Sequence, residues 1–222
     1  MTTHDVLLEN KKSAKPQNPS AASAIADDIR NYAFNRPTRP LPLTYEANGD
    51  IGLFHQYAEL KNSLYANVWG LNNSDYNPKL PPIMAHRGRL CIGGVQMVIA
   101  SPQEPLKLPC ERNGLILRQC LPEMGLGYLV YGEIADLAIL PGYQNNAIIA
   151  ELFERVVKAA IAAGVKYLFM ITTPLQAKHY MQMAQGVGLT SRIIENITLP
   201  DYEELAGGKA CLTVLDLMMQ EA

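Results

Sequence analysis

The most regular pattern of apolar and polar positions lies in the segment Glu133–Gly164. An apolar run, Glu133–Leu140, is followed by the turn Pro141–Asn146 and then by the segment Ala147–Gly164. In that last segment the apolar residues recur at helical spacing: Ile148, Ile149, Leu152, Phe153, Val156 and Ala160. The pattern predicts a strand, a turn and an amphipathic helix.

The polar face of the predicted helix carries two acid–base pairs four residues apart, Glu151 with Arg155 and Glu154 with Lys158. The acid comes first in both pairs, which is the stabilising order in a helix. Asn145 or Asn146 is suited to cap the start of the helix, and Gly164 fits just past its end. The apolar run Lys166–Thr172 follows and is typical of a strand covered on both faces. Together these segments predict a βαβ unit with a right-handed crossover.

The rest of the chain predicts an antiparallel first half and further elements after the βαβ unit. The expected helices are Ser20–Phe34, Ile51–Val68 and Pro174–Gln185, with one short helix and a turn at Pro122 within Cys110–Gly127. The expected extended segments are Leu41–Glu46, the hairpin Ile83–His86 with Arg89–Ala100, the long central strand Tyr128–Leu140, and Thr190–Ile197 and Lys209–Leu217. The polar residues 1–19 are expected to be a mobile tail. Residues 20–222 are then a single α/β (α+β) domain, a mixed central sheet flanked by helices.

Composition narrows the class of protein. The 222 residues are 48% hydrophobic and 18% charged, which suits a globular chain and excludes general disorder. A net charge of −2 gives no sign of a nucleic-acid partner. The sequence has no apolar run of membrane-spanning length and no signal peptide, so we expect a soluble cytoplasmic protein. The four cysteines lack C-x-x-C spacing, which favours free buried thiols and no metal site.

The strand–turn–helix segment resembles the signature of the GNAT acyltransferase superfamily. In that signature an Arg or Gln followed by glycines opens the helix, and the free amides there bind the pyrophosphate of coenzyme A. The resemblance implies that Gln144, Asn145, Asn146 and Ala147 hold the acyl donor. Ala147 and Ile149 replace the usual glycines, and their side chains reduce the space in which a pyrophosphate would bind. An acyl-carrier-protein donor is therefore expected in preference to a coenzyme A thioester.

The first half resembles the autoinducer (acyl-homoserine-lactone) synthases and the related N-acyl amino acid synthases. The matching segments are Leu60-Lys61-x-x-x-Tyr65, Trp69, Asp75-Tyr76-Asn77 and Gly93-Gly94-Val95-Gln96. The family pattern has arginine at the first and last of these motifs, ends its acidic cluster in aspartate, and adds a Glu-x-x-Arg on the central strand. Here Lys61, Asn77, Gln96 and Asp136 replace those residues, while Glu133 is retained. These departures favour an acceptor other than that of a homoserine-lactone synthase.

The resemblance implies an N-acyltransferase that moves a fatty acyl group from an acyl-carrier-protein or acyl-CoA thioester to the amine of an amino acid or similar metabolite. Two alternatives stay open: a non-catalytic module that binds an acyl thioester or lipid, and a plain acetyl-CoA-dependent N-acetyltransferase. Convergence of the altered positions on one pocket with Glu133 favours catalysis, whereas their dispersal favours binding. The central strand and Lys166–Thr172 are expected to be parallel neighbours that diverge near Pro141, which opens a slot for the thioester arm.

Glu133 is the candidate general base, because acyl transfer to an amine requires that the amine lose a proton. The alternative is a structural glutamate with a cationic partner. Asp136 lies three residues on and faces the opposite side of a regular strand, unless a bulge brings both to one face. By resemblance, Tyr180 protonates the departing thiolate; the alternative is a tyrosine of the core.

The resemblance makes Lys61, Trp69, Asp75, Gln96 and Asp136 the substrate-binding residues. Each has a plainer reading: Lys61 lies on an apolar helix stripe with Phe54 and Tyr57 and can extend its ammonium to solvent. Trp69 is suited to the core, and Asp75 to a turn. The basic residues Arg155, Lys158 and Lys166 either receive an acidic carrier protein or belong to a solvated face.

Overall fold

The computed structural model describes residues 41–47, 50–65, 80–104, 107–111, 114–195, 197–199 and 210–218. All of them belong to the unit Leu41–Ala222. The predicted tail, the helix expected from Ser20, and the candidates Trp69, Asp75 and Asn77 lie outside the described residues. Within the described residues, no helix is long and apolar enough to cross a membrane.

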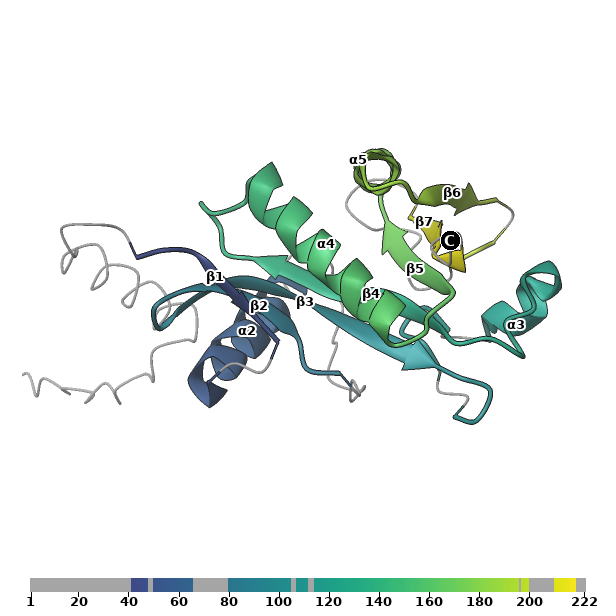
Figure 1. Ribbon diagram of the computed structural model, residues 1–222, viewed down its shortest axis with the longest axis horizontal. Coiled ribbons are helices and arrows are strands. Elements are labelled where there is room, and N and C mark those ends of the chain that lie inside the picture. Colours follow the sequence, from purple (N-terminus) through teal and green to yellow (C-terminus); the bar gives the residue numbers. More distant parts are fainter. Residues whose placement is uncertain are drawn as a thin grey trace, which may run out of the picture. The chain divides into compact units, whose positions relative to one another are not determined.

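The described strands form one mixed sheet in the order β1-β2-β3-β4-β5-β7-β6 (Figure 1). Their bounds are β1 Thr44–Glu46, β2 Ile83–Arg87, β3 Leu90–Ala100, β4 Tyr131–Ile139, β5 Tyr167–Thr172, β6 Thr190–Ile194 and β7 Cys211–Asp216. Neighbouring strands are antiparallel except β4 and β5, which are parallel. This parallel pair is the βαβ unit that periodicity predicted, and the predicted mixed sheet flanked by helices is confirmed.

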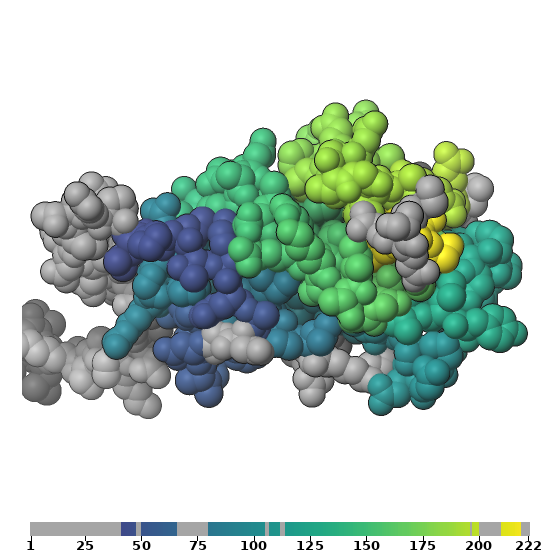
Figure 2. Space-filling view, in the orientation of Figure 1, coloured from purple at the N-terminus to yellow at the C-terminus, as the bar shows by residue number. Residues whose placement is uncertain are grey.

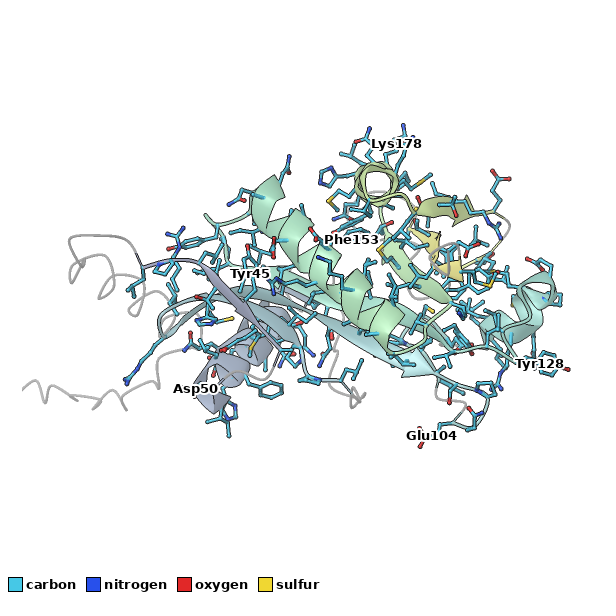
Figure 3. The ribbon with its side chains drawn as sticks, viewed as in Figure 1. Tyr45, Asp50, Glu104, Tyr128, Phe153 and Lys178 are labelled. Atoms are coloured by element: carbon cyan, nitrogen blue, oxygen red, sulfur yellow. The ribbon has the colours of Figure 1, made fainter. Side chains whose placement is uncertain are left out.

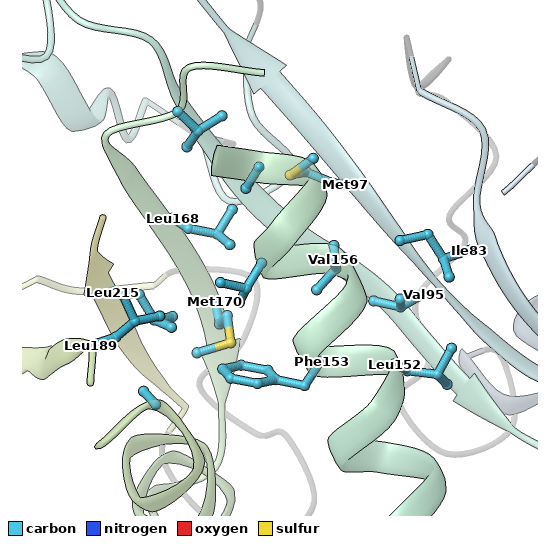
Figure 4. Packing of buried hydrophobic residues seen from close by; sticks show 14 of the residues in the cluster. Ile83, Val95, Met97, Leu152, Phe153, Val156, Leu168, Met170, Leu189 and Leu215 are labelled. Atoms are coloured by element: carbon cyan, nitrogen blue, oxygen red, sulfur yellow. The ribbon is translucent and has the colours of Figure 1, made fainter. Parts of the chain in front are cut away.

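Helices cover both faces of the sheet. Their bounds are α2 Ile51–Leu64, α3 Leu117–Cys120, α4 Asn146–Ala162 and α5 Pro174–Gly186, with a 3₁₀ turn at Pro122–Met124. Helices α4 and α5 pack with one face of the sheet over a cluster that includes Val95, Leu168 and Leu215 (Figure 4). On the other face, residues 108–111 and 114–126, which we call the segment 108–126, pack over a cluster that includes Val98 and Phe169.

Helix α2 packs on the same face as the segment 108–126, as the glycine at position 94 shows. A Cβ added to Gly94 would lie 2.9 Å from the Tyr57 ring, so only glycine lets the helix approach the sheet this closely. By strand alternation Gln96 and Val98 face the same side as Gly94. The predicted apolar stripe is wrong at Phe54, which is 43% exposed, because the helix buries Leu53, Tyr57 and Leu60 instead.

The long central strand β4 is paired with β3 along its whole length, but with β5 only at its start. The last pair between β4 and β5 joins Glu133 to Phe169. The two strands therefore diverge directly after Glu133, well before Pro141, where divergence was expected. The physical reason is a bulge in β4, because a bulge bends its strand and increases the local twist.

Candidate active site

The bulge in β4 centres on Asp136. Gln96 of β3 pairs with Ala135, and Gly94 pairs with Ala138, so Asp136 and Leu137 together oppose a single residue of β3. Among the described residues, Asp136 is the non-glycine residue with a positive φ, at 55°. Such backbone costs about 1–3 kcal/mol and persists only where neighbouring groups hold it.

Two side chains of α2, one turn apart, hold Asp136. The Tyr57 hydroxyl donates a hydrogen bond of 2.6 Å to the Asp136 carbonyl oxygen, and Lys61 Nζ lies 3.2 Å from the carboxylate. The Asp136 side chain is 1% exposed and that of Lys61 14%. Lys61 and Asp136, which stand where the resembled sequence pattern has arginines, thus form an ion pair.

Glu133 lies on the same face of the sheet. It pairs with Val98 of β3, which by alternation faces α2, and the bulge lets the Asp136 carboxylate reach α2 as well. The condition under which both carboxylates share a face is therefore met. Glu133 is buried, and its Oε2 accepts a hydrogen bond of 2.8 Å from the Cys110 amide.

The segment that supplies the Cys110 amide is held by a second buried carboxylate. Glu111 accepts hydrogen bonds from the amides of Leu108, at 2.9 Å, and Leu117, at 2.8 Å. Burial, followed by the negative charge of Glu133, raises the pKa of the Cys110 thiol well above its usual range. Cys110 therefore stays a neutral thiol beside Glu133 and is no nucleophile.

Where β4 and β5 separate, a pocket of about 60 Å³ opens between them. Its lining includes Asp136 and Leu137 of β4, Met170 and Thr172 of β5, Phe153 of α4 and Tyr180 of α5. Figure 3 shows Phe153 between α4 and α5, and Figure 4 shows its ring beside Met170. We call this pocket the β4–β5 slot.

Tyr180 of α5 also lines the slot. Its ring stacks on Phe153, with centroids 5.5 Å apart and planes at 26°. Burial raises the pKa of Tyr180 to about 12, so its hydroxyl remains protonated at any physiological pH. The slot is therefore lined by an acidic residue, Asp136, and by a tyrosine whose hydroxyl is protonated.

The start of α4 is exposed at Gln144, Asn145, Asn146 and Ala147. The Asn145 side chain caps the helix by accepting a hydrogen bond of 3.0 Å from the Ile148 amide. Gln144 Nε2 lies 3.5 Å from the Ile139 carbonyl oxygen. One helix-opening amide is therefore already satisfied by the protein itself.

Of the described candidate residues, Asp136 and Tyr180 line the slot, whereas Glu133, Lys61 and Gln96 do not. Lys61, Asp136 and Glu133 lie on the α2 side, Gln96 is buried opposite Ala135, and Tyr180 lines the slot. The cations of α4 have local partners: Arg155 with Glu151 and Lys158 with Glu154, as the helical spacing predicted. Arg155 also lies 4.9 Å from the centre of the Tyr45 ring.

Sequence reasoning missed several residues of this site. Tyr57 precedes Lys61 by one helical turn, a spacing that signals a shared face. Glu111 and Cys110 carried no local signal, because their partners Leu117 and Glu133 are set by the path of the chain. Cys120, expected to be buried, is exposed, while Cys91 and Cys110 are buried as expected, and all four thiols are free.

No protein-family model and no curated protein sequence matches the chain. Solved structures do. FeeM, an N-acyl amino acid synthase from uncultured soil microbes, superposes with a TM-score of 0.58 at 14% identity, over 80% of this chain and 92% of its own. BjaI, a CoA-dependent acyl-homoserine lactone synthase solved with SAM and isopentyl-CoA, has a TM-score of 0.52 at 12% identity, over 76% and 77%. At these identities the likeness establishes a shared fold.

Proposed function

We propose that this protein is an N-acyltransferase that moves a fatty acyl group from a thioester donor to the amine of an amino acid or a similar small metabolite. The observation that carries the proposal is the β4–β5 slot, which is lined by Asp136 and by Tyr180 with its protonated hydroxyl. The shared fold of an N-acyl amino acid synthase and an acyl-homoserine lactone synthase supports it. A thioester donor and free thiols both fit the reducing cytoplasm, where we place the enzyme.

The reaction needs two proton transfers. The acceptor nitrogen attacks the thioester carbonyl carbon, the carbon–sulfur bond breaks, and the thiolate departs. Glu133, at the point where the strands separate, takes the proton from the amine directly or through one water. Tyr180 gives a proton to the sulfur and regains one from water; its hydroxyl, with a pKa of about 12, carries its proton before the reaction.

The acceptor site is the α2 side of the slot. Lys61 and Asp136 present one charge of each sign, 3.2 Å apart. An amino acid carries the complementary pair, so its carboxylate is suited to Lys61 and its ammonium to Asp136. Gln96 is buried next to this pair, opposite Ala135, and is the third acceptor-binding residue that we assign. Trp69 and Asp75 complete the proposed set.

The donor binds with its arm in the slot and its phosphate at the start of α4, at residues 144–147. Asn145 already occupies the Ile148 amide, and Ala147 stands where the pattern has glycine, so room for a pyrophosphate is reduced. We therefore propose an acyl carrier protein as the preferred donor. The balanced pairs of Arg155 and Lys158 make α4 a weak docking surface, so this preference rests on the helix start alone.

The experiment that tests the function is steady-state transfer with one acyl chain presented on two carriers, acyl carrier protein and coenzyme A, against a panel of amino acids. Formation of an N-acyl amino acid supports the enzyme, and a higher kcat/KM with the carrier protein supports the donor. A higher kcat/KM with coenzyme A overturns the donor assignment alone.

One observation favours a second candidate, a non-catalytic module that binds an acyl thioester. Glu133 and Asp136 both have partners within the protein, the Cys110 amide and Lys61. If they are fully engaged, a bound thioester is held and not consumed. Binding of acyl-pantetheine without product for any acceptor in the panel would select this module over the enzyme.

A further inference from the structure

A second and larger pocket, of about 250 Å³, lies between the second half of α4 and the end of α5. Its apolar lining comes from Phe153, Val157 and Ile161 of α4 and from Val187 and Leu189 after α5. Figure 2 shows α4 in green beside α5 in yellow-green. We call this second pocket the α4–α5 pocket.

Phe153 lines both the slot and the α4–α5 pocket, so the two spaces meet at this residue. The ring is buried and stacks on Tyr180, the proposed acid of the slot. No other residue that lines the α4–α5 pocket also lines the slot.

Volume decides what each space can hold. An apolar cavity of about 150 Å³ holds benzene, which is about 25 Å³ for each carbon. On that scale the slot, at about 60 Å³, has room for two or three carbons beyond the reacting group. The α4–α5 pocket, at about 250 Å³, has room for about ten. A fatty chain exceeds the slot and fits the pocket.

The chemistry of the lining agrees with an alkyl chain. Five of the lining side chains are apolar, and the two charged ones, Glu154 and Lys158, pair with each other. Val187 is 47% exposed, so apolar surface here remains to be covered. Each methylene of an alkyl chain that is buried against this surface should improve binding by about fourfold.

We propose that the α4–α5 pocket houses the acyl chain of the donor, with up to about twelve carbons in all, and that Phe153 controls its passage from the slot. This inference rests on the proposed function, since it assigns the chain of the thioester that the slot holds. Phe153 is then a residue that determines chain-length specificity. The chain passes when the ring turns away from Tyr180.

The test measures binding and needs no turnover. Calorimetry compares two acyl-pantetheine analogues in which a methylene replaces the thioester sulfur, one with a ten-carbon acyl group and one with a two-carbon group. The parent protein is expected to bind the long analogue about a hundredfold more tightly or better. Val187→Trp and Ile161→Trp fill the pocket from opposite walls and should each reduce this ratio about tenfold or more.

The matched control is Ile51→Trp, which places the same indole on an aliphatic residue that is 74% exposed on α2, outside both pockets. The control should leave the ratio unchanged. A ratio near one in the parent, or a ratio that neither pocket-filling variant lowers, overturns the proposal whatever the individual affinities do. If the long analogue binds and the pocket-filling variants block it as expected, but the protein transfers no acyl group, the pocket assignment is supported and the proposed enzymatic function is refuted.

Discussion

The two halves of strand β4 differ sharply, although both are apolar in sequence. Residues 131–133 pair with β3 on one edge and with β5 on the other. Residues 134–139 keep only β3, and they contain the bulge and the strained Asp136. The first half is paired on both edges, whereas the second half pairs with β3 alone, and the slot lies on the side where β5 has separated.

The carboxylates on the two halves differ accordingly. Glu133, in the last residue pair with β5, is held by a backbone amide. Asp136, on the separated half, is held by a cation and by a hydroxyl on its own carbonyl group. In keeping with these positions, we propose proton transfer for Glu133, at the point where the strands separate, and substrate binding for Asp136, on the separated half.

The largest effect expected from this comparison is that of Glu133→Gln. A general base contributes about 10²–10⁴-fold, so kcat should fall by that factor while donor binding is kept. The fall should shrink at high pH, where more of the acceptor amine is already neutral. Steady-state kinetics between pH 7 and 10 measure both quantities.

Glu111→Gln is the control for this variant, since Glu111 is also a buried carboxylate held by backbone amides. It should affect stability and leave the pH profile of kcat unchanged. If Asp136→Asn abolishes turnover while Glu133→Gln leaves it intact, the two roles are reversed and Asp136 is the base.

The next largest effect concerns stability on the separated half. Lys61→Met leaves the Asp136 carboxylate buried beside an apolar side chain. Removing one partner of a buried pair costs about 3–5 kcal/mol, and the partial exposure of Lys61 lowers our expectation to about 2–4 kcal/mol. Urea denaturation measures the loss, and the double variant Lys61→Met with Asp136→Asn should recover most of it.

A smaller loss is expected at the backbone of the bulge. Tyr57→Phe removes the hydroxyl that donates to the Asp136 carbonyl oxygen and leaves a buried acceptor without this partner. The unfolding free energy should fall by about 1–3 kcal/mol. The same variant should raise KM for the acceptor, because Asp136 is less well held. If the KM for the acceptor is unchanged, the bulge does not position the acceptor site.

The sequence predicted the βαβ unit because helical and strand periods are local properties of Glu133–Thr172. It could not predict the bulge, since Asp136 stands in an apolar run with neither glycine nor proline to signal a break. The early divergence of β4 and β5 follows from that bulge and was missed with it. Phe153 was correctly predicted to lie on the apolar face of the helix. Its position between two cavities depends on where α5 packs, which no local pattern encodes.

The smallest effect, Tyr180→Phe, tests the α5 lining of the slot. The variant keeps the ring that stacks on Phe153 and removes only the proton donor. A thiolate is a tolerable leaving group without a proton, so kcat should fall by no more than about tenfold, with KM unchanged. An oxygen-ester donor, whose alkoxide leaves poorly, should suffer a larger loss, and the ratio of the two losses is the measurement.

The raised pKa of Tyr180 adds a second readout at alkaline pH. The hydroxyl, with a pKa of about 12 in the folded protein against 10.0 for an ordinary tyrosine, stays protonated in the native state after it has ionised in the unfolded chain. Its contribution to stability is complete below pH 10 and is lost as the pH rises to about 12. Tyr180→Phe should therefore make the unfolding free energy fall less steeply between those values. A slope identical to that of the parent would mean that Tyr180 titrates as an exposed tyrosine does, and the slot would then lack a buried acid.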